Sequence, residues 1–285
     1  MTLKNRNILL TGASRGIGRA LAFTLARAGA RLALMARTEE ALLQISQEIK
    51  EMGGSAIPIT VDIAQPQVLD AAISQALSAL GHVDVLINNA GIQAPIGFFL
   101  ENDPLEWEYI FRLHLFGPAR LIRAVVPVMN ARGGGKIINF SGGGAAGPRP
   151  NFSAYATSKA ALVRLTETLA VEFAPYNIQV NAVAPGAVNT QMLDEVLAAG
   201  EKAGEEYHQA QKRARNGGTP VELICDLVKF LASPASGSLT GKLIAAPHDP
   251  WREWADKGEE LNATPLYTIR RLDPFTIKPI IQKLG

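Results

Sequence analysis

One stretch near the start of the chain decides the fold: Asn7-Ile-Leu-Leu-Thr-Gly-Ala-Ser-Arg-Gly-Ile-Gly18. Its first residues predict an apolar strand, and an amphipathic helix is predicted from Arg15 to Ala28, just before Gly29. Between them, Gly12 allows a tight turn, Gly16 lets the backbone approach a diphosphate, and Gly18 permits close packing of helix on strand. The helix N-terminus offers free N–H groups and the positive end of a dipole. The stretch therefore predicts a phosphate-binding turn.

The rest of the chain continues this alternation of apolar strands and helices. Strands are predicted at Asn7–Leu10, Arg31–Ala36, Ala56–Val61, Val83–Asn88, Lys136–Ser141, Ile178–Val183 and Lys242–Ala246. Helices are predicted at Arg15–Ala28, Glu39–Met52, Pro66–Leu80, Pro104–Ala131, Ser153–Phe173 and Val221–Leu231, with Pro118 and Pro127 expected to bend or shorten the fourth. Such alternation implies a parallel sheet of about seven strands with helices on both faces. Right-handed crossovers make this α/β sheet doubly wound.

Composition excludes several classes of protein. The 285 residues, of which 47% are hydrophobic, can bury the core of one large domain or two small ones. A net charge of +2 argues against a nucleic-acid partner. Cys225 is the single cysteine, so it cannot form an internal disulfide, and with four scattered histidines it cannot build a metal site. No apolar segment is long enough for a membrane span or signal peptide, so we expect a cytoplasmic protein with no membrane partner.

The end of the second strand favours one dinucleotide over another. An NAD site normally has an acidic residue here for the ribose 2′-hydroxyl group. This chain instead has Ala36 followed by Arg37, with Arg15 in the glycine turn. Two guanidinium groups could clamp a 2′-phosphate, which favours NADP. The alternative is that both arginines merely face solvent.

Four motifs together resemble the short-chain dehydrogenase/reductase family. They are Thr11-Gly-Ala-Ser-Arg-Gly-Ile-Gly18, Asn88-Asn-Ala-Gly91, Tyr155-Ala-Thr-Ser-Lys159 and Pro185-Gly186, in the family's order. The resemblance covers about Asn5 to Ala246. It implies a Rossmann-type core, hydride transfer between a nicotinamide and a ketone or secondary alcohol, and a homodimer or homotetramer.

The glycine turn, Arg37 and the resemblance together give a set of expected cofactor-binding residues. The resemblance places Asp62 near the adenine, Asn88 and Ala90-Gly91 beside the ribose, and Val188 and Thr190 near the nicotinamide amide and the diphosphate. The full set is Gly12, Ser14, Arg15, Gly16, Ile17, Gly18, Arg37, Asp62, Asn88, Ala90, Gly91, Tyr155, Lys159, Pro185, Gly186, Val188 and Thr190.

Tyr155 and Lys159 are the expected catalytic pair. Their spacing of four residues puts them on one helical face. A nearby ammonium favours the phenolate and should lower the tyrosine pKa from about 10. Tyr155 could then exchange a proton with the substrate oxygen. The resemblance also implies that Lys159 holds the ribose hydroxyl groups, and within these motifs catalysis is favoured over a solvated helix face.

The chain departs from the family where a serine should bind the substrate oxygen. That position is Gly142, and Ser141 lies one residue earlier, so on a strand its side chain would point to the opposite face. The neighbouring glycines could let the backbone turn and bring Ser141, or a main-chain N–H, toward the oxygen. Ser153 is a further candidate. Alternatively, Ser141 is only a hydroxyl at a strand end.

A second departure lies in the long helix, where His114 replaces the family's catalytic asparagine. The asparagine acts largely through its backbone carbonyl, so that role could survive. The imidazole could relay a proton, since its unperturbed pKa is near 6.5. Equally, His114 could be a helix residue bonded to a neighbouring backbone carbonyl.

Two functions stay open on these residues. The first is an active NADP(H)-dependent oxidoreductase, and the second is a catalytically decayed NADP-binding sensor or scaffold. Retention of Tyr155 and Lys159 favours the first. The stretch 186–220 is expected either to cover a small carbonyl or alcohol substrate as a lid or to be a solvated helix face.

The pattern of strands and helices stops near Ala246. We therefore predict a catalytic NADP-binding domain at residues 1–250 and an extension at 251–285 packed on the same domain. The extension's aromatic and basic residues could border the active site or build a subunit interface. They are Trp251, Trp254, Tyr267, Arg270 and Arg271.

Overall fold

The computed structural model describes residues 1–271, 273 and 277. It contains one parallel sheet in the order β3-β2-β1-β4-β5-β6-β7. Strands β1 to β3 are added toward one edge of the sheet and strands β4 to β7 toward the other, so the direction of strand addition changes between β1 and β4. The strands are β1 (Asn7–Thr11), β2 (Arg31–Ala36), β3 (Ser55–Thr60), β4 (Val85–Asn88), β5 (Gly135–Phe140), β6 (Ile178–Ala184) and β7 (Leu243–Ala245). This order confirms the predicted doubly wound, Rossmann-type α/β fold.

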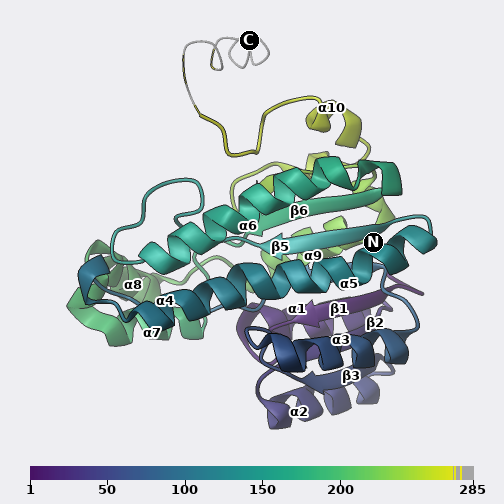
Figure 1. Ribbon diagram of the computed structural model, residues 1–285, viewed down its shortest axis with the longest axis horizontal. Helices are drawn as coiled ribbons and strands as arrows, with labels where there is room; N and C mark the ends of the chain where they lie inside the picture. The colour runs from purple at the N-terminus through teal and green to yellow at the C-terminus, as the bar shows by residue number, and fades with distance from the viewer. Residues whose placement is uncertain (272, 274–276, 278–285) are drawn as a thin grey trace.

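Helices cover both faces of the sheet (Figure 1). One face carries α1 (Gly16–Arg27), α2 (Glu39–Glu51) and α9 (Val221–Ala232), and the other carries α3 (Pro66–Leu80), α5 (Gly117–Ala131) and α6 (Ser153–Glu172). The remaining helices are α4 (Pro104–Phe111), α7 (Gln191–Ala199), α8 (Glu205–Asn216) and α10 (Gly258–Asn262). Short 3₁₀ turns lie at Phe99–Glu101, Ala174–Tyr176, Gly200–Ala203, Pro234–Ser236 and Trp251–Glu253.

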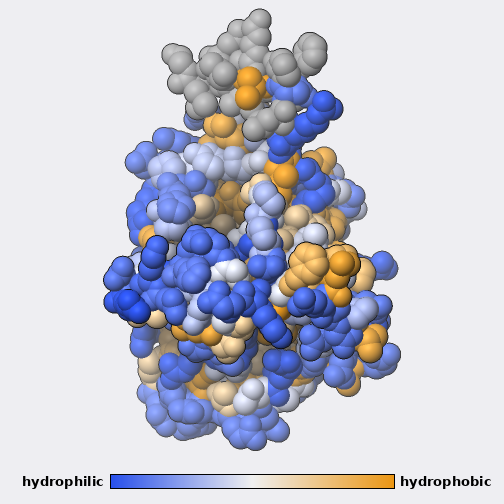
Figure 2. All heavy atoms as spheres, turned by 90° about the vertical axis from the view of Figure 1, so that its left-hand side faces the viewer, coloured by the Kyte–Doolittle hydropathy of each residue, from blue (hydrophilic) through white to orange (hydrophobic). Residues whose placement is uncertain are grey.

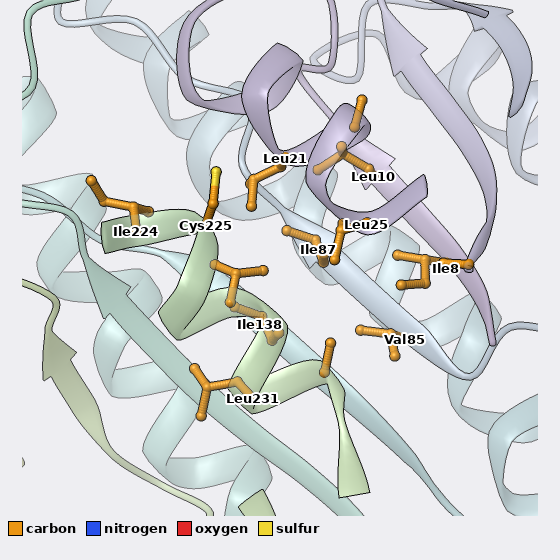
Figure 3. Packing of buried hydrophobic residues seen from close by; sticks show 14 of the residues in the cluster. Ile8, Leu10, Leu21, Leu25, Val85, Ile87, Ile138, Ile224, Cys225 and Leu231 are labelled. Carbon is orange, nitrogen blue, oxygen red and sulfur yellow. The ribbon is translucent and has the colours of Figure 1, made fainter. Parts of the chain in front are cut away.

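The core forms because the strands are apolar on both sides. Ile8 and Leu10 of β1 belong to one cluster with Leu21 of α1 and Leu231 of α9, which Figure 3 shows. Burying each such side chain contributes roughly 1.5–3 kcal/mol. Cys225 of α9 belongs to the same cluster, and burial raises the pKa of its thiol. The thiol is therefore a packing group in this fold.

The long helix predicted at Pro104–Ala131 is three segments. A π-helical segment, Arg112–Phe116, separates α4 from α5. Pro118 lies in the first turn of α5, where a missing N–H costs little, and α5 continues through Pro127 to Ala131. The break therefore comes from the wider π turn just before Pro118, and Pro127 does not end α5.

The extension returns to the sheet beside β7. The backbone N–H of Leu243 donates to the carbonyl of Tyr267 at 2.7 Å. The buried Lys242 ammonium donates to the carbonyls of Thr264 (2.9 Å) and Leu266 (3.1 Å). These contacts attach the described part of the extension to the last strand. Residues 272, 274–276 and 278–285 of the predicted extension lie outside the described residues.

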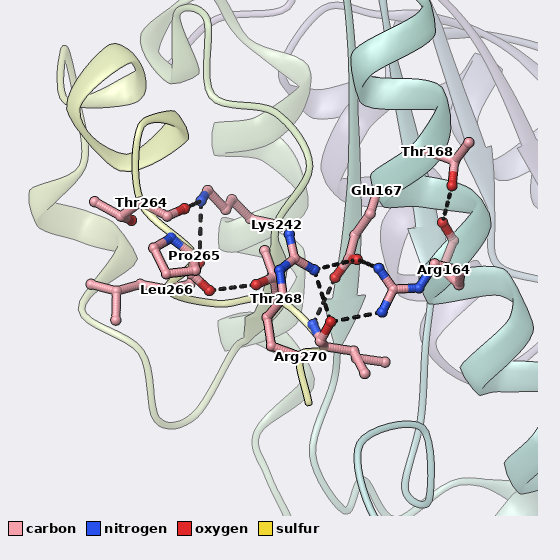
Figure 4. Close-up of polar contacts among 10 residues, drawn as sticks. Arg164, Glu167, Thr168, Lys242, Thr264, Pro265, Leu266, Thr268 and Arg270 are labelled. Carbon is pink, nitrogen blue, oxygen red and sulfur yellow. Dashed lines mark hydrogen bonds and ion pairs between the residues drawn. The ribbon is translucent and has the colours of Figure 1, made fainter. Parts of the chain in front are cut away.

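One carboxylate of α6 fixes the next part of the extension. Glu167, whose side chain is 7% exposed, accepts from the backbone N–H of Ile269 (2.7 Å) and from Arg270 (2.8 Å). Arg164 contacts the same carboxylate and donates to the carbonyl of Ile269 (Figure 4). Glu167 therefore joins α6 to the extension through both main chain and side chain.

No helix within the described part of the chain is both long enough and apolar enough to cross a bilayer.

Replacing Glu167 with alanine should loosen the extension. The change leaves two arginines and one backbone N–H without their carboxylate, which should lower the free energy of unfolding by about 1–3 kcal/mol, between the values for exposed and buried pairs. Hydrogen exchange at residues 264–271 should accelerate. Glu172→Ala, at an exposed position of the same helix, is the control. Unchanged exchange in Glu167→Ala would contradict this role.

Candidate active site

Two adjoining cavities lie at the carboxyl ends of the strands, on the side where α7 and α8 are found in Figure 1. The first, about 150 Å³, is bordered by the glycine turn, the end of β2 and the loop after β4. It brings together Gly12, Ser14, Arg15, Gly16, Ile17, Gly18, Arg37, Asp62, Ala90, Gly91 and Thr190 from the predicted set. The second, about 320 Å³, is lined by Tyr155, Pro185, Gly186, Val188 and Thr190.

The glycine turn is built by very close packing. A Cβ atom on Gly18 would lie 1.9 Å from the carbonyl oxygen of Gly12, so only glycine lets α1 approach β1 this closely. Gly12 and Gly16 have positive φ angles of 67° and 52°. Arg15 at the start of α1 provides no side-chain cap. Unused N–H groups at a helix N-terminus beside a cavity fit a diphosphate.

Asn89, which the sequence analysis did not single out, holds this turn in place. Its side-chain amide donates to the carbonyls of Thr11 (3.0 Å) and Gly12 (3.1 Å). Asn88, which was expected beside the ribose, is instead buried in β4 and donates to Asn139 at 2.8 Å. Asn88 lines neither cavity. The two adjacent asparagines were visible in the sequence, but only the strand geometry shows which one reaches the turn.

The two expected 2′-phosphate ligands both line the first cavity. Arg37 donates to the hydroxyl of Tyr109 at 3.3 Å, and that hydroxyl donates to Asp62 at 3.0 Å. Arg15 contacts Gln191 and lies 3.6 Å from Glu195, both on α7. Arg15 therefore connects the glycine turn to α7.

Tyr155 and Lys159 are both buried on α6. Burial raises the pKa of Tyr155 to about 12, although the positive charge of Arg149 opposes this rise. Burial also lowers the pKa of Lys159 to about 7. The Lys159 ammonium donates to the carbonyl of Phe140 at 2.8 Å and lies 5.8 Å from the Tyr155 ring centre. The expected lowering of the Tyr155 pKa by Lys159 is therefore wrong here, because burial dominates and Arg149 is the cation acting on the phenol.

His114 is fully buried in the π-helical segment. Its Nε2 accepts from the backbone N–H of Ile92 (3.3 Å), and its Nδ1 is 2.9 Å from Ser158 Oγ. Because Ser158 donates to the carbonyl of Tyr155, the network assigns the imidazole proton to Nδ1. Burial, with the charge of Lys159, holds the pKa of His114 well below its usual value. Both ring nitrogens are used, which favours a positioning role over a proton relay.

Neither serine candidate reaches the second cavity. Ser141 is buried, and its hydroxyl has no hydrogen-bond partner within the described part of the chain. The Ser153 hydroxyl accepts from the Trp107 indole at 3.3 Å. The cavity wall at this point consists of Gly142 and Gly143. Position 142 therefore presents only main chain to a substrate.

The extension's aromatic and basic residues lie away from both cavities. Trp251 and Trp254 are buried in the core beside α9, and the Trp251 indole donates to the carbonyl of Ala246 at 3.1 Å. Tyr267 packs on Trp254 with ring centres 4.5 Å apart. None of these residues, nor Arg270 or Arg271, lines either cavity.

The α7–α8 segment lies beside the second cavity. Leu193 and Val196 of α7 line it, as do Glu206 and Arg213 of α8. This end of the molecule faces the viewer in Figure 2, where the surface is mostly hydrophilic with scattered apolar groups. The segment thus contributes both apolar and charged side chains to the cavity wall, and the lid expected at 186–220 stays a prediction.

Comparisons with known proteins agree with this geometry. A family model described as short chain dehydrogenase matches residues 6–200. Short-chain reductase protein NovJ from Streptomyces niveus is 38% identical over 242 residues, which cover 83% of this chain and 90% of that protein.

Two solved structures share the fold closely. Gluconate 5-dehydrogenase from Burkholderia cenocepacia, in complex with NADP and tartrate, has a TM-score of 0.76 at 32% identity, covering 86% of this chain and 94% of that one. A 3-ketoacyl-(acyl-carrier-protein) reductase from Brucella melitensis, complexed with NADH, has a TM-score of 0.75 at 28% identity, covering 86% and 97%. This chain therefore belongs to the short-chain dehydrogenase/reductase family of oxidoreductases.

Proposed function

We propose that the protein is an NADP(H)-dependent oxidoreductase that reduces a ketone, or oxidises the matching secondary alcohol, with Tyr155 as proton donor or acceptor. One observation carries this proposal: the cavity beside the glycine turn and the cavity that contains Tyr155 share Ile17, Thr190 and Met192 as lining residues. A dinucleotide in the first cavity can thus present its nicotinamide to a substrate in the second.

A nicotinamide cofactor is supported by the first cavity and by relatives solved with NADP or NADH. The choice of NADP rests on charge. β2 ends at Ala36, without the carboxylate that would bind a 2′-hydroxyl group, and Arg37 lines the cavity next to it. Arg15 lines the same cavity while also contacting Gln191 and Glu195 of α7, so it is a second guanidinium near the place proposed for a 2′-phosphate.

A bound nicotinamide supplies or accepts the hydride at the substrate carbon. During reduction, the Tyr155 hydroxyl gives its proton to the carbonyl oxygen as the C=O double bond becomes a single bond. A pKa of about 12 keeps this phenol protonated at neutral pH, which is the form that reduction requires. Lys159 does not itself line either cavity, but a Cβ on Gly91, which lines the first cavity, would be 3.5 Å from Lys159 Nζ. This closeness supports the proposed role of Lys159 near the cofactor.

Family membership also supports a homodimer or homotetramer, which sedimentation of the purified protein would test.

Replacing Tyr155 with phenylalanine should abolish reduction while leaving cofactor binding intact. The variant loses only the proton donor, so kcat should fall by about 10²–10⁴ and the Kd for NADPH should change little. NADPH oxidation with a panel of ketones, sugars and acyl thioesters measures the first quantity, and fluorescence titration measures the second. Normal turnover by Tyr155→Phe would sink the mechanism. A wild-type protein that binds NADPH but reduces no compound would favour the sensor or scaffold function instead.

Replacing Arg37 with alanine should weaken NADPH binding selectively. A lost charge-assisted bond to the 2′-phosphate is worth about 1.5–3 kcal/mol, or roughly a 10- to 100-fold rise in Kd. NADH has no such phosphate, so its Kd should change little. Arg132→Ala, at the exposed end of α5, controls for general loss of positive charge. Equal losses for NADPH and NADH in Arg37→Ala would contradict the assignment.

A further inference from the structure

We propose that Arg149 binds the substrate oxygen beside Tyr155 and so replaces the serine that position 142 lacks. The inference rests on the proposed function, since it assigns a residue to that reaction. Arg149 lies in the loop between β5 and α6 and lines the second cavity together with Gly142, Gly143 and Tyr155. It is thus a cation in the wall that contains the proton donor.

The Arg149 guanidinium is held firmly on one side. It lies over the Phe152 ring at 3.9 Å from the ring centre and is 5.4 Å from that of Tyr155. Its Nη2 donates to Glu206 of α8 at 3.0 Å and to Gln93 at 3.4 Å. Stacking and two hydrogen bonds fix the plane of the guanidinium, whereas the guanidinium of an exposed surface arginine would be free to rotate.

On the other side, the same guanidinium has an unused donor. The side chain is only 10% exposed, and its Nε is buried without a hydrogen-bond partner within the described residues. A buried donor left unpaired costs about 1–3 kcal/mol. That atom is enclosed by protein, so the donor within reach of the cavity is Nη1, for which no hydrogen bond to a described residue is found. The structure therefore contains a positioned cation with a second, accessible donor for a substrate oxygen.

The glycines explain how Arg149 can take this role. A Cβ on Gly142 would lie 2.0 Å from the Tyr155 hydroxyl, and a Cβ on Gly143 would lie 3.7 Å from Arg149 Nε. The Tyr155 hydroxyl therefore occupies the place that a side chain at position 142 would take, and only glycine backbone lies between the phenol and the guanidinium. A charged donor makes a hydrogen bond roughly twice as strong as a neutral hydroxyl does. It would also stabilise negative charge developing on that oxygen.

The alternative is a purely structural role, in which Arg149 only connects the loop to α8 through its ion pair with Glu206. The two roles predict different results. A structural ion pair is lost equally when Glu206 or Arg149 is replaced, whereas a cation that binds the substrate oxygen is lost only when Arg149 is replaced. Glu206→Ala therefore serves as the matched variant, and Arg123→Met, at an exposed position of α5, controls for loss of an arginine elsewhere.

The kinetic experiment compares Arg149→Met, Arg149→Lys and Glu206→Ala with the wild type, using a ketone that the wild type reduces. Arg149→Met should lower kcat by about 10²–10³, as loss of an oxyanion donor does, with an unchanged Kd for NADPH as proof of folding. Arg149→Lys should retain on the order of a tenth of the activity, because it keeps the charge but not the planar fork. Glu206→Ala should lose less than about tenfold, because the cation remains. Arg149 opposes the rise in the Tyr155 pKa, so the pKa should be higher in Arg149→Met. Alcohol oxidation needs the deprotonated phenol, so its pH profile should shift to higher pH in this variant.

A second measurement needs no turnover. Acetate, a stable oxygen anion, is titrated into each protein in its NADPH complex by calorimetry. The wild type should bind it, and Arg149→Met should bind at least about tenfold more weakly, as expected for loss of a bond to a charged group. If the wild type reduces no ketone, the proposed function fails while the acetate comparison still decides the role of Arg149. Equal acetate binding by Arg149→Met, no binding by the wild type, or equal kinetic losses in Arg149→Met and Glu206→Ala would overturn the proposal.

Discussion

The approach of α1 to β1 at the glycine turn is the constraint on which the rest of the structure depends. Gly18 lies so close to the Gly12 carbonyl that any side chain would collide with main chain, and Asn89 bonds the same carbonyl from the loop after β4. The turn between β1 and α1 is thereby joined to the loop after β4, which is distant in sequence. The N-terminus of α1, the end of β2 and the loop after β4 then border one cavity.

Burial sets the chemistry of the neighbouring cavity. Tyr155 and Lys159 both lie within the fold, and the same desolvation that raises the pKa of the phenol lowers that of the amine. At neutral pH the phenol is therefore protonated, and Lys159, with a pKa of about 7, is only partly charged. His114 shares this buried environment and is neutral, so it orients the loop at Ile92 and the helix at Ser158 without adding charge.

This chain has Gly142 and His114 where the family has a serine and an asparagine, so other groups surround the site. His114, in the π-helical segment, bonds to Ser158 of α6, and Gly142 and Gly143 line the second cavity together with Arg149. Beside β7, the last strand of the sheet, Glu167 of α6, Lys242 and the extension form a separate polar cluster (Figure 4). The extension's two tryptophans pack in the core beside α9. The described contacts of the extension are therefore separate from the two cavities.

The sequence by itself determined the α/β fold and the glycine turn, because both depend on local patterns, namely apolar runs and glycines between strand and helix. The predicted role of Tyr155 and Lys159 rests on the resemblance to the family, since a spacing of four on a helix alone would equally fit a solvated face. Only the tertiary structure decided that Asn89 rather than Asn88 supports the turn, that neither serine candidate lines the second cavity, and that the extension's two tryptophans are buried. It also placed Arg149 beside Tyr155 and reversed the expected change in the tyrosine pKa. Each of these depends on which way a side chain points and on how much water surrounds it, and residues far apart in the sequence set both.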